Sequence, residues 1–254
     1  MNKTKSLVKA FEVLELFLEV ERDDLRLADI AKLSGLKMST ANRIAATLVD
    51  LGYLSQSGKR GKYSIGKKLT FFDSILSKKN TFKDLVRPYL IKLNESTGET
   101  VVLVNFDGKR VFFVENIISK HALNIRPDWS TTTPLYCTGV GKIFLADMTE
   151  PELEAYFKNT DIKSYTPNTI TDLNLLKRHL MMVAQEGVAY DDEEFLPGVR
   201  NIASGVKDNE GKTFCCIGIL GPTVRLTRAK MIDITVDLKR YTSEISKEIG
   251  FKNS

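Results

Sequence analysis

The stretch LADIAKLSGLKMSTANRIAATLVDLGYL, residues 27–54, decides the fold of the N-terminal third of the chain. Its first part, 27–33, carries apolar residues at helical spacing, and Gly35 follows where a tight turn needs a positive φ angle. A second helix is expected over 38–51. Two short helices joined by such a turn are typical of a helix-turn-helix unit.

The second helix has one apolar and one polar side. The apolar side is formed by Ala41, Ile44, Leu48 and Leu51. The opposite side is small and hydrogen-bonding and consists of Ser39, Asn42, Arg43 and Ala46. Arg43 suits a bidentate contact with guanine and Asn42 one with adenine, whereas Lys37 and Thr40 near the helix start suit phosphates. This face predicts base reading in the major groove.

The flanking segments complete a winged head. Upstream, a helix ending near 21–24 is expected to bury the stripe Leu7, Ala10, Phe11, Leu14, Phe17 and Leu18. Downstream, strands at 53–56 and 62–65 flank a basic loop, whose Lys59, Arg60 and Lys62 would lie along the DNA backbone or in the minor groove. A purely structural three-helix bundle with a solvated hairpin is the alternative. The wing, in its proper place and order, favours DNA binding.

The composition is that of an ordinary folded protein. The 254 residues are 43% apolar and 27% charged, with a net charge of +5, which permits a nucleic-acid partner without requiring one. The length suggests two domains. No apolar run reaches membrane-spanning length, and Glu12 and Glu15 interrupt any signal-peptide core, so a cytoplasmic protein is expected. Three cysteines without a CxxC pair predict neither zinc nor another cofactor.

A connector is expected over 67–80, between a head at 1–66 and a larger domain at 81–254. Its apolar residues Leu69, Phe72 and Leu76 fall on one side of a helix. This stripe packs either against the chain's own domains or against the same helix of a second subunit. Dimerisation is favoured, because a single head reads only one half-site and a symmetric operator matches a symmetric dimer.

The larger domain is predicted to be an α+β fold with an antiparallel sheet, of the GAF-like sensing kind. The strands are expected at 101–105, 110–115, 122–126, 188–191, 201–206 and 212–220. The helices are expected from Phe82 to Gly98, near 139–147, 150–159 and 172–186, and over a long C-terminal segment. Hairpins and helices in this order indicate ligand sensing.

Two glycines precede the helix near 139–147. In Thr138-Gly139-Val140-Gly141-Lys142 they would leave the first backbone N–H groups unobstructed, which makes a ready site for a carboxylate. The alternative is that the glycines only allow a tight turn. The spacing fails the phosphate-loop pattern GxxxxGK[ST], so nucleotide binding is rejected.

The whole chain resembles the IclR family of bacterial transcriptional regulators. The resemblance rests on the head and on RPYLIKLNESTGETVVL, PLYCTGVGKIFLA, GVAYDDEEFLPGVRNIASGV and GILGP. It implies a dimer, or a dimer of dimers, on a pseudo-palindromic operator and a small acidic or aromatic effector. The implied effector positions are Gly139, Val140, Asp191, Asn201, Gly218 and Leu220.

Three of these positions depart from the residues common in the family. Asn201 stands where many members carry Cys, and Gly218 and Leu220 stand where sensors of glyoxylate or pyruvate often present Ser. A larger or less polar ligand is therefore expected, since Gly218 would free volume and Leu220 offers apolar surface. Asp191 is expected to accept a hydrogen bond from an effector hydroxyl or from a backbone N–H.

An enzyme is the competing class of function. A hydrolase would use Cys137 or Cys215 as the nucleophile, with His121 or His179 and a carboxylate. No nucleophile motif surrounds any of them, His179 is expected on a helix surface, and Cys215 lies in an apolar strand typical of core packing. Catalysis is therefore not expected.

Overall fold

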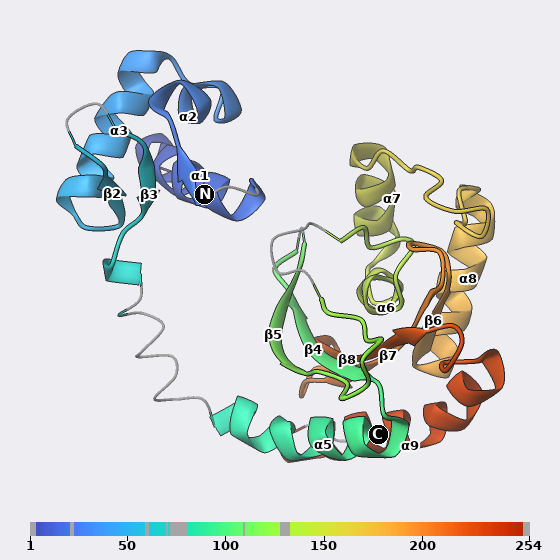
Figure 1. The fold of residues 1–254 in the computed structure, drawn as a ribbon. Helices are drawn as coiled ribbons and strands as arrows, with labels where there is room; N and C mark the ends of the chain where they lie inside the picture. The colour runs from blue at the N-terminus through green and yellow to red at the C-terminus, as the bar shows by residue number, and fades with distance from the viewer. Residues whose placement is uncertain are drawn as a thin grey trace. The chain divides into compact units, whose positions relative to one another are not determined.

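The computed structural model describes residues 4–20, 23–58, 61–69, 71, 81–108, 110–127 and 133–250. They form two compact units, which divide between Asn80 and Thr81 (Figure 1). Most of the expected connector, including Phe72 and Leu76, lies outside the described residues, as do the wing residues Lys59 and Arg60.

The first unit is a winged helix-turn-helix head. Its elements are α1 (Lys5–Glu19), β1 (Asp24–Leu25), α2 (Leu27–Leu33), α3 (Met38–Asp50), β2 (Leu54–Gln56) and β3 (Tyr63–Ile65). The turn between α2 and α3 holds Gly35 at φ +64°, as the sequence predicts. The strands form an antiparallel sheet in the order β1-β3-β2. The predicted head is thus confirmed, with β1 as an extra strand that pairs Leu25 with Tyr63.

The buried face of α1 differs from the prediction. Val13 and Leu16 enter the core of the head, whereas Leu7 and Phe11 of the expected stripe are 58% and 55% exposed. The helix is apolar on two sides, and α3 and the wing cover only one of them. Likewise, Leu51 follows α3 as its C-terminal cap and is exposed, and Ala45 takes the buried place beside Ala41.

The second unit is an α+β domain, as predicted. Its helices are α5 (Thr81–Thr97), α6 (Gly139–Ala146), α7 (Glu150–Asn159), α8 (Leu173–Glu186) and α9 (Arg228–Glu248). Its strands are β4 (Thr100–Phe106), β5 (Val111–Ile117), β6 (Val188–Asp192), β7 (Val199–Lys207) and β8 (Thr213–Pro222). They form one antiparallel sheet in the order β5-β4-β8-β7-β6. None of the described helices is long and apolar enough to cross a membrane.

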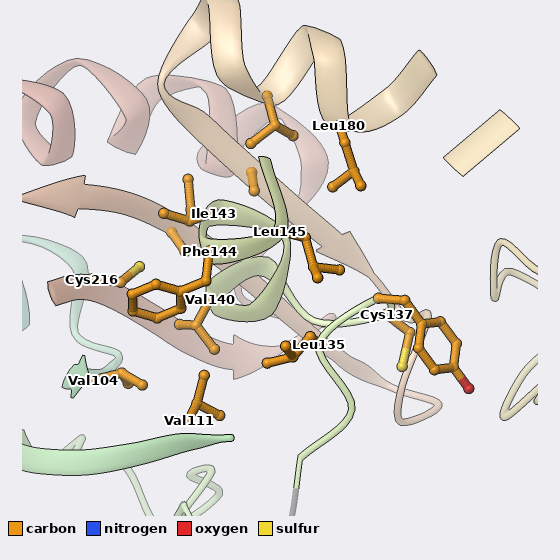
Figure 2. Packing of buried hydrophobic residues seen from close by; sticks show 14 of the residues in the cluster. Val104, Val111, Leu135, Cys137, Val140, Ile143, Phe144, Leu145, Leu180 and Cys216 are labelled. Atoms are coloured by element: carbon orange, nitrogen blue, oxygen red, sulfur yellow. The ribbon is translucent and has the colours of Figure 1, made fainter. Parts of the chain in front are cut away.

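Helices cover both faces of this sheet (Figure 1). On one face α5 and α9 pack on the side chains of Leu103, Ile202 and Ile217. On the other face α6 and α8 pack on Val104 and Cys216. Figure 2 shows this second layer, in which α6 projects its apolar residues onto the strands. Helix α6 lies across β6, β7 and β8. It packs on the face of the sheet to which alternate residues of these strands point.

The expected strand at 122–126 is wrong. This segment follows β5 as a series of bends and open chain. Asn124 Nδ2 donates to the carbonyl oxygen of His121 at 2.7 Å, and Arg225 donates to that of Leu123 at 2.7 Å. Because side chains bind these carbonyl groups, the segment is held without a strand ladder.

Candidate DNA interface and effector site

The polar face of α3 is open to solvent. Lys37, Ser39, Asn42, Arg43 and Ala46 are exposed, as the sequence predicts, and Thr40 is half-buried. The fully buried Ala41 and Ala45 fix the opposite face against the core. Within the described residues, the side chains of Lys37, Ser39, Asn42 and Arg43 have no hydrogen-bond or ion-pair partner. Their polar ends are therefore available to a ligand.

The wing sheet is regular, but its one described lysine is already paired. Ser55 lies opposite Ser64, with hydroxyl oxygens 2.8 Å apart. Lys62 Nζ lies 2.8 Å from Asp24 Oδ1. The pair forms because β1, which the sequence did not predict, runs beside β3. Both side chains are nearly half exposed, so the ion pair is weak and Lys62 can exchange partners.

An open apolar groove of about 1050 Å³ lies between α1 and α3. Exposed Leu7 and Phe11 line it on α1, and Ile44 lines it on α3. Thr40 and Arg43 of α3, Leu51 just after that helix and Leu69 also contribute to the lining. Contiguous apolar surface of this kind is typical of a protein contact site.

In the second unit, α6 packs against β6 and β7. Thr138 is its N-cap, and its hydroxyl oxygen accepts from the N–H of Gly141 at 3.3 Å. A Cβ on Gly141 would lie 2.3 Å from the Cα of Leu135, and one on Gly139 would lie 2.2 Å from Asn201 Oδ1. Both glycines therefore permit close packing. Within the described residues, the N–H groups of Gly139 and Val140 have no acceptor, so the helix start also keeps two free donors.

The six expected effector residues gather around this helix start. Asp191, Asn201 and Leu220 lie side by side on β6, β7 and β8. Gly139 contacts Asn201, and Val140 contacts Gly218. The expectation that Gly218 frees volume is wrong, because a Cβ there would lie 2.8 Å from Val140 and 3.1 Å from Val102. Neighbouring side chains already fill that space.

Asp191 is held by the turn that follows β6. Its Oδ1 accepts from the N–H of Glu194 at 2.7 Å, which is the backbone alternative of the two partners expected. Burial raises the pKa of the Asp191 carboxyl to about 7, and the negative charge of Glu194 adds to the shift. The next residue, Asp192, pairs with Arg200 at 2.6 Å and with Arg228 at 2.5 Å.

The sequence did not single out a buried ion pair beside this site. Lys142 of α6 is fully buried, donates to the carbonyl oxygen of Tyr190 at 2.9 Å and pairs with Glu194. The hydroxyl groups of Thr166 and Thr169 donate to the carbonyl groups of Glu193 and Glu194, at 2.6 Å each, and so fix the turn. The lysine after the second glycine was the available signal, but its partner is 52 positions away.

The residues required by the enzyme hypothesis are unsuited to catalysis. Burial raises the pKa of the Cys137 thiol to about 12 and raises that of Cys215 as well. His179, expected at the surface, is half-buried, and burial together with Lys142 lowers its pKa to about 4. Across the described residues no cluster of His, Cys, Asp or Glu could hold a metal ion.

Two family models match this chain. Residues 6–58 match the IclR helix-turn-helix domain, and residues 75–247 match the C-terminal domain of the bacterial transcriptional regulator IclR. The chain belongs to the IclR family. Members of this family are DNA-binding transcriptional regulators rather than enzymes, and the exposed face of α3 fits that role.

Individual members of the family align with this chain over nearly its whole length. The regulator XynR of Escherichia coli is 28% identical over 97% of this chain and 98% of its own. The crystal structure of the IclR protein of Thermotoga maritima is 28% identical, with a TM-score of 0.65 over 98% of this chain and all of that one. An IclR homologue from Microbacterium hydrocarbonoxydans, solved in complex with 4-hydroxybenzoate, shares the fold at 21% identity, with a TM-score of 0.76 over 96% of this chain and 98% of its own.

Proposed function

We propose that this chain binds a pseudo-palindromic operator as a homodimer or a dimer of dimers, and that a small organic, sugar or aromatic acid changes its operator affinity. The proposed DNA contacts are Lys37, Ser39, Thr40, Asn42 and Arg43 of α3 and Lys59, Arg60 and Lys62 of the wing. The proposed effector contacts are Gly139, Val140, Asp191, Asn201, Gly218 and Leu220.

The exposed, unpaired polar face of α3 carries the DNA part of the proposal. Arg43 and Asn42 are adjacent, exposed and free of side-chain partners among the described residues, so neither must break an existing contact to reach a base. The buried Ala41 and Ala45 hold the helix so that this face points outward. A good bidentate base contact contributes about 1–3 kcal/mol of discrimination.

The test starts with an operator selected from random DNA and measures binding by fluorescence anisotropy. Arg43→Ala is expected to weaken operator binding about tenfold to a hundredfold while leaving binding to random DNA nearly unchanged. Arg178→Ala, on an exposed face of α8, is the matched control and should leave both affinities unchanged. If Arg43→Ala binds operator and random DNA as the native chain does, the assignment of α3 is wrong.

The apolar groove beside α1 supports dimerisation of the heads. Leu7 and Phe11 expose more than half of their surface, and Leu69 at the start of the expected connector lines the same groove. Phe11→Asp is expected to remove the advantage of a complete operator over a half-site. Leu33→Asp, at a leucine of α2 that is 49% exposed and lies outside the groove, is the control. An unchanged preference for the complete operator in Phe11→Asp would contradict dimerisation through this groove.

The free N–H groups at the start of α6 support an acidic effector, because a helix N-terminus attracts anions. The 4-hydroxybenzoate complex of the Microbacterium protein supports an aromatic acid as one possibility. A thermal-shift screen of organic, sugar and aromatic acids identifies ligands, and operator affinity is then measured with each. Ligands that raise the melting temperature without changing operator affinity would contradict the coupling.

A further inference from the structure

Asn201 places an unpaired oxygen at the centre of the candidate effector site. Its side chain is 3% exposed, and its Nδ2 donates to the carbonyl oxygen of Ile219 at 3.2 Å. That bond fixes the orientation of the amide, because a flipped amide would bring two oxygen atoms together. The Oδ1 atom then has no hydrogen-bond partner. A buried acceptor without a donor costs free energy, so a donor from a ligand would stabilise it.

The same atom lies at the start of α6. A Cβ on Gly139 would come within 2.2 Å of Asn201 Oδ1, so the acceptor faces the first residue of the helix. The N–H groups of Gly139 and Val140 are free donors among the described residues. The N–H groups that could bind an anion and the Asn201 oxygen that could accept a hydrogen bond therefore lie close together at the start of α6.

This arrangement adjoins a solvent-accessible position. Leu220 lies directly opposite Asn201 on β8 and is only partly buried. The α6 helix covers β6, β7 and β8. A ligand that lies on the apolar side chain of Leu220 reaches Asn201 across one strand spacing, which is about 5 Å.

The charges nearby favour a neutral donor over a cationic one. Among the described residues, Glu194 is the other one with an unpaired buried side-chain oxygen, but its charge is matched by the ammonium group of Lys142. A ligand ammonium group would add a second cation beside Lys142, and the carboxyl of Asp191, which lies opposite Asn201, compensates for it little below pH 7, because burial raises the pKa of that carboxyl to about 7. An unmatched buried charge is costly. A hydroxyl group satisfies Asn201 Oδ1 without that cost.

We propose that the effector is a hydroxy acid with its hydroxyl group close to its carboxylate. The carboxylate accepts from the N–H groups of Gly139 and Val140, and the hydroxyl group donates to Asn201 Oδ1. The inference rests on the proposed function, in which an acid binds at this site, and adds the chemical class that Asn201 selects.

The test compares acids that differ by one hydroxyl group. Glycolate and acetate, lactate and propionate, mandelate and phenylacetate, and 2-hydroxyhexanoate and hexanoate are titrated into the native full-length chain by calorimetry. At least one hydroxy acid is expected to bind about tenfold more tightly than its partner. Alanine and phenylglycine replace the hydroxyl group by an ammonium group and are expected to bind more weakly than lactate and mandelate.

Asn201→Leu removes the acceptor at similar size, and a melting curve verifies that the variant folds. It is expected to abolish the preference for the hydroxy acid while still binding the simple acid. The paired acids in the native chain keep the test valid if this variant does not fold. Acids that bind without a hydroxyl preference, a preference retained in Asn201→Leu, or tighter binding of the amino acids overturn the hydroxy-acid inference alone. Binding by none of the acids overturns the acidic effector as well.

Discussion

Lys142 of α6 and Glu194 of the turn after β6 form an ion pair inside the effector domain, with side chains that are 0% and 7% exposed. The lysine also binds the carbonyl oxygen of Tyr190, and the threonines of the 166–169 loop fix the turn from its other side. The pair thus links the helix whose start forms the candidate effector site to the strand that carries Asp191. Rigid supports of this kind keep a binding site in its geometry.

Loss of Lys142 alone should destabilise this domain strongly. Lys142→Met leaves Glu194 buried without its partner, which is expected to cost about 3–5 kcal/mol of unfolding free energy in urea titrations. Lys142→Met combined with Glu194→Leu should recover most of that loss, because no unpaired charge remains. Lys177→Met, which breaks the exposed pair with Glu150, is the control and should cost less than about 1 kcal/mol. Equal losses in the two single variants would contradict the role of the buried pair.

The pKa of Asp191 predicts a pH-dependent stability. Burial raises this pKa to about 7 in the folded chain, whereas an unfolded aspartate titrates near 4. Its contribution to stability is therefore fully present below about pH 4 and is lost as the pH rises towards 7. Asp191→Asn keeps an acceptor for the N–H of Glu194 but does not ionise. Between pH 5 and pH 8 the variant should gain about 2 kcal/mol relative to the native chain. A constant difference across this range would contradict the raised pKa.

The lowered pKa of His179 predicts the opposite dependence of stability on pH. Its pKa is lowered to about 4 by burial and by Lys142, so its contribution is present above the unfolded value near 6.5 and is lost as the pH falls towards 4. His179→Gln is expected to unfold less readily than the native chain as the pH is lowered from 7 to 4.5. Melting temperatures measured across this range check the prediction, which is wrong if both proteins lose stability in parallel.

Local patterns in the sequence predict most of the helices and strands. The turn glycine and the apolar spacing place α2 at Leu27–Leu33 and α3 at Met38–Asp50, within one residue of expectation. Both signals lie within one or two turns of chain. The exposed polar face of α3 follows from the same periodicity, because it is the side opposite the core.

The remaining features depend on tertiary contacts. The apolar residues of α1 occur on two sides, and only packing decides that Val13 is buried while Phe11 is exposed. The two residues of β1 are too few to show any period. At the effector site, the side chains of Val140 and Val102 occupy the space beside Gly218, and they come from other elements of the fold. A pattern within one segment does not report such contacts.

Gly141 of α6 and Gly218 of β8 should respond differently to replacement by alanine. Alanine usually stabilises a helix relative to glycine, but a Cβ at Gly141 would overlap the backbone of Leu135, which cannot move aside. At Gly218 the Cβ would meet the ends of the Val140 and Val102 side chains, which can adjust. Gly218→Ala is therefore expected to cost about 1–3 kcal/mol and Gly141→Ala clearly more, measured by urea unfolding. The reverse order would contradict the packing described at the start of α6.

The ion pair between Lys62 and Asp24 should limit the affinity of the head for DNA. The two charged groups are 2.8 Å apart and nearly half exposed, so Asp24→Asn is expected to change stability by less than about 1 kcal/mol. The same change frees the lysine for a phosphate and removes a negative charge beside the wing. Operator affinity should rise, and the plot of log affinity against log salt should steepen by about 0.9, as for one more phosphate contact. Asp161→Asn, which breaks the exposed pair with Lys163 in the other domain, is the matched control and should change neither quantity. An unchanged salt slope in Asp24→Asn would show that Lys62 does not contact the DNA backbone.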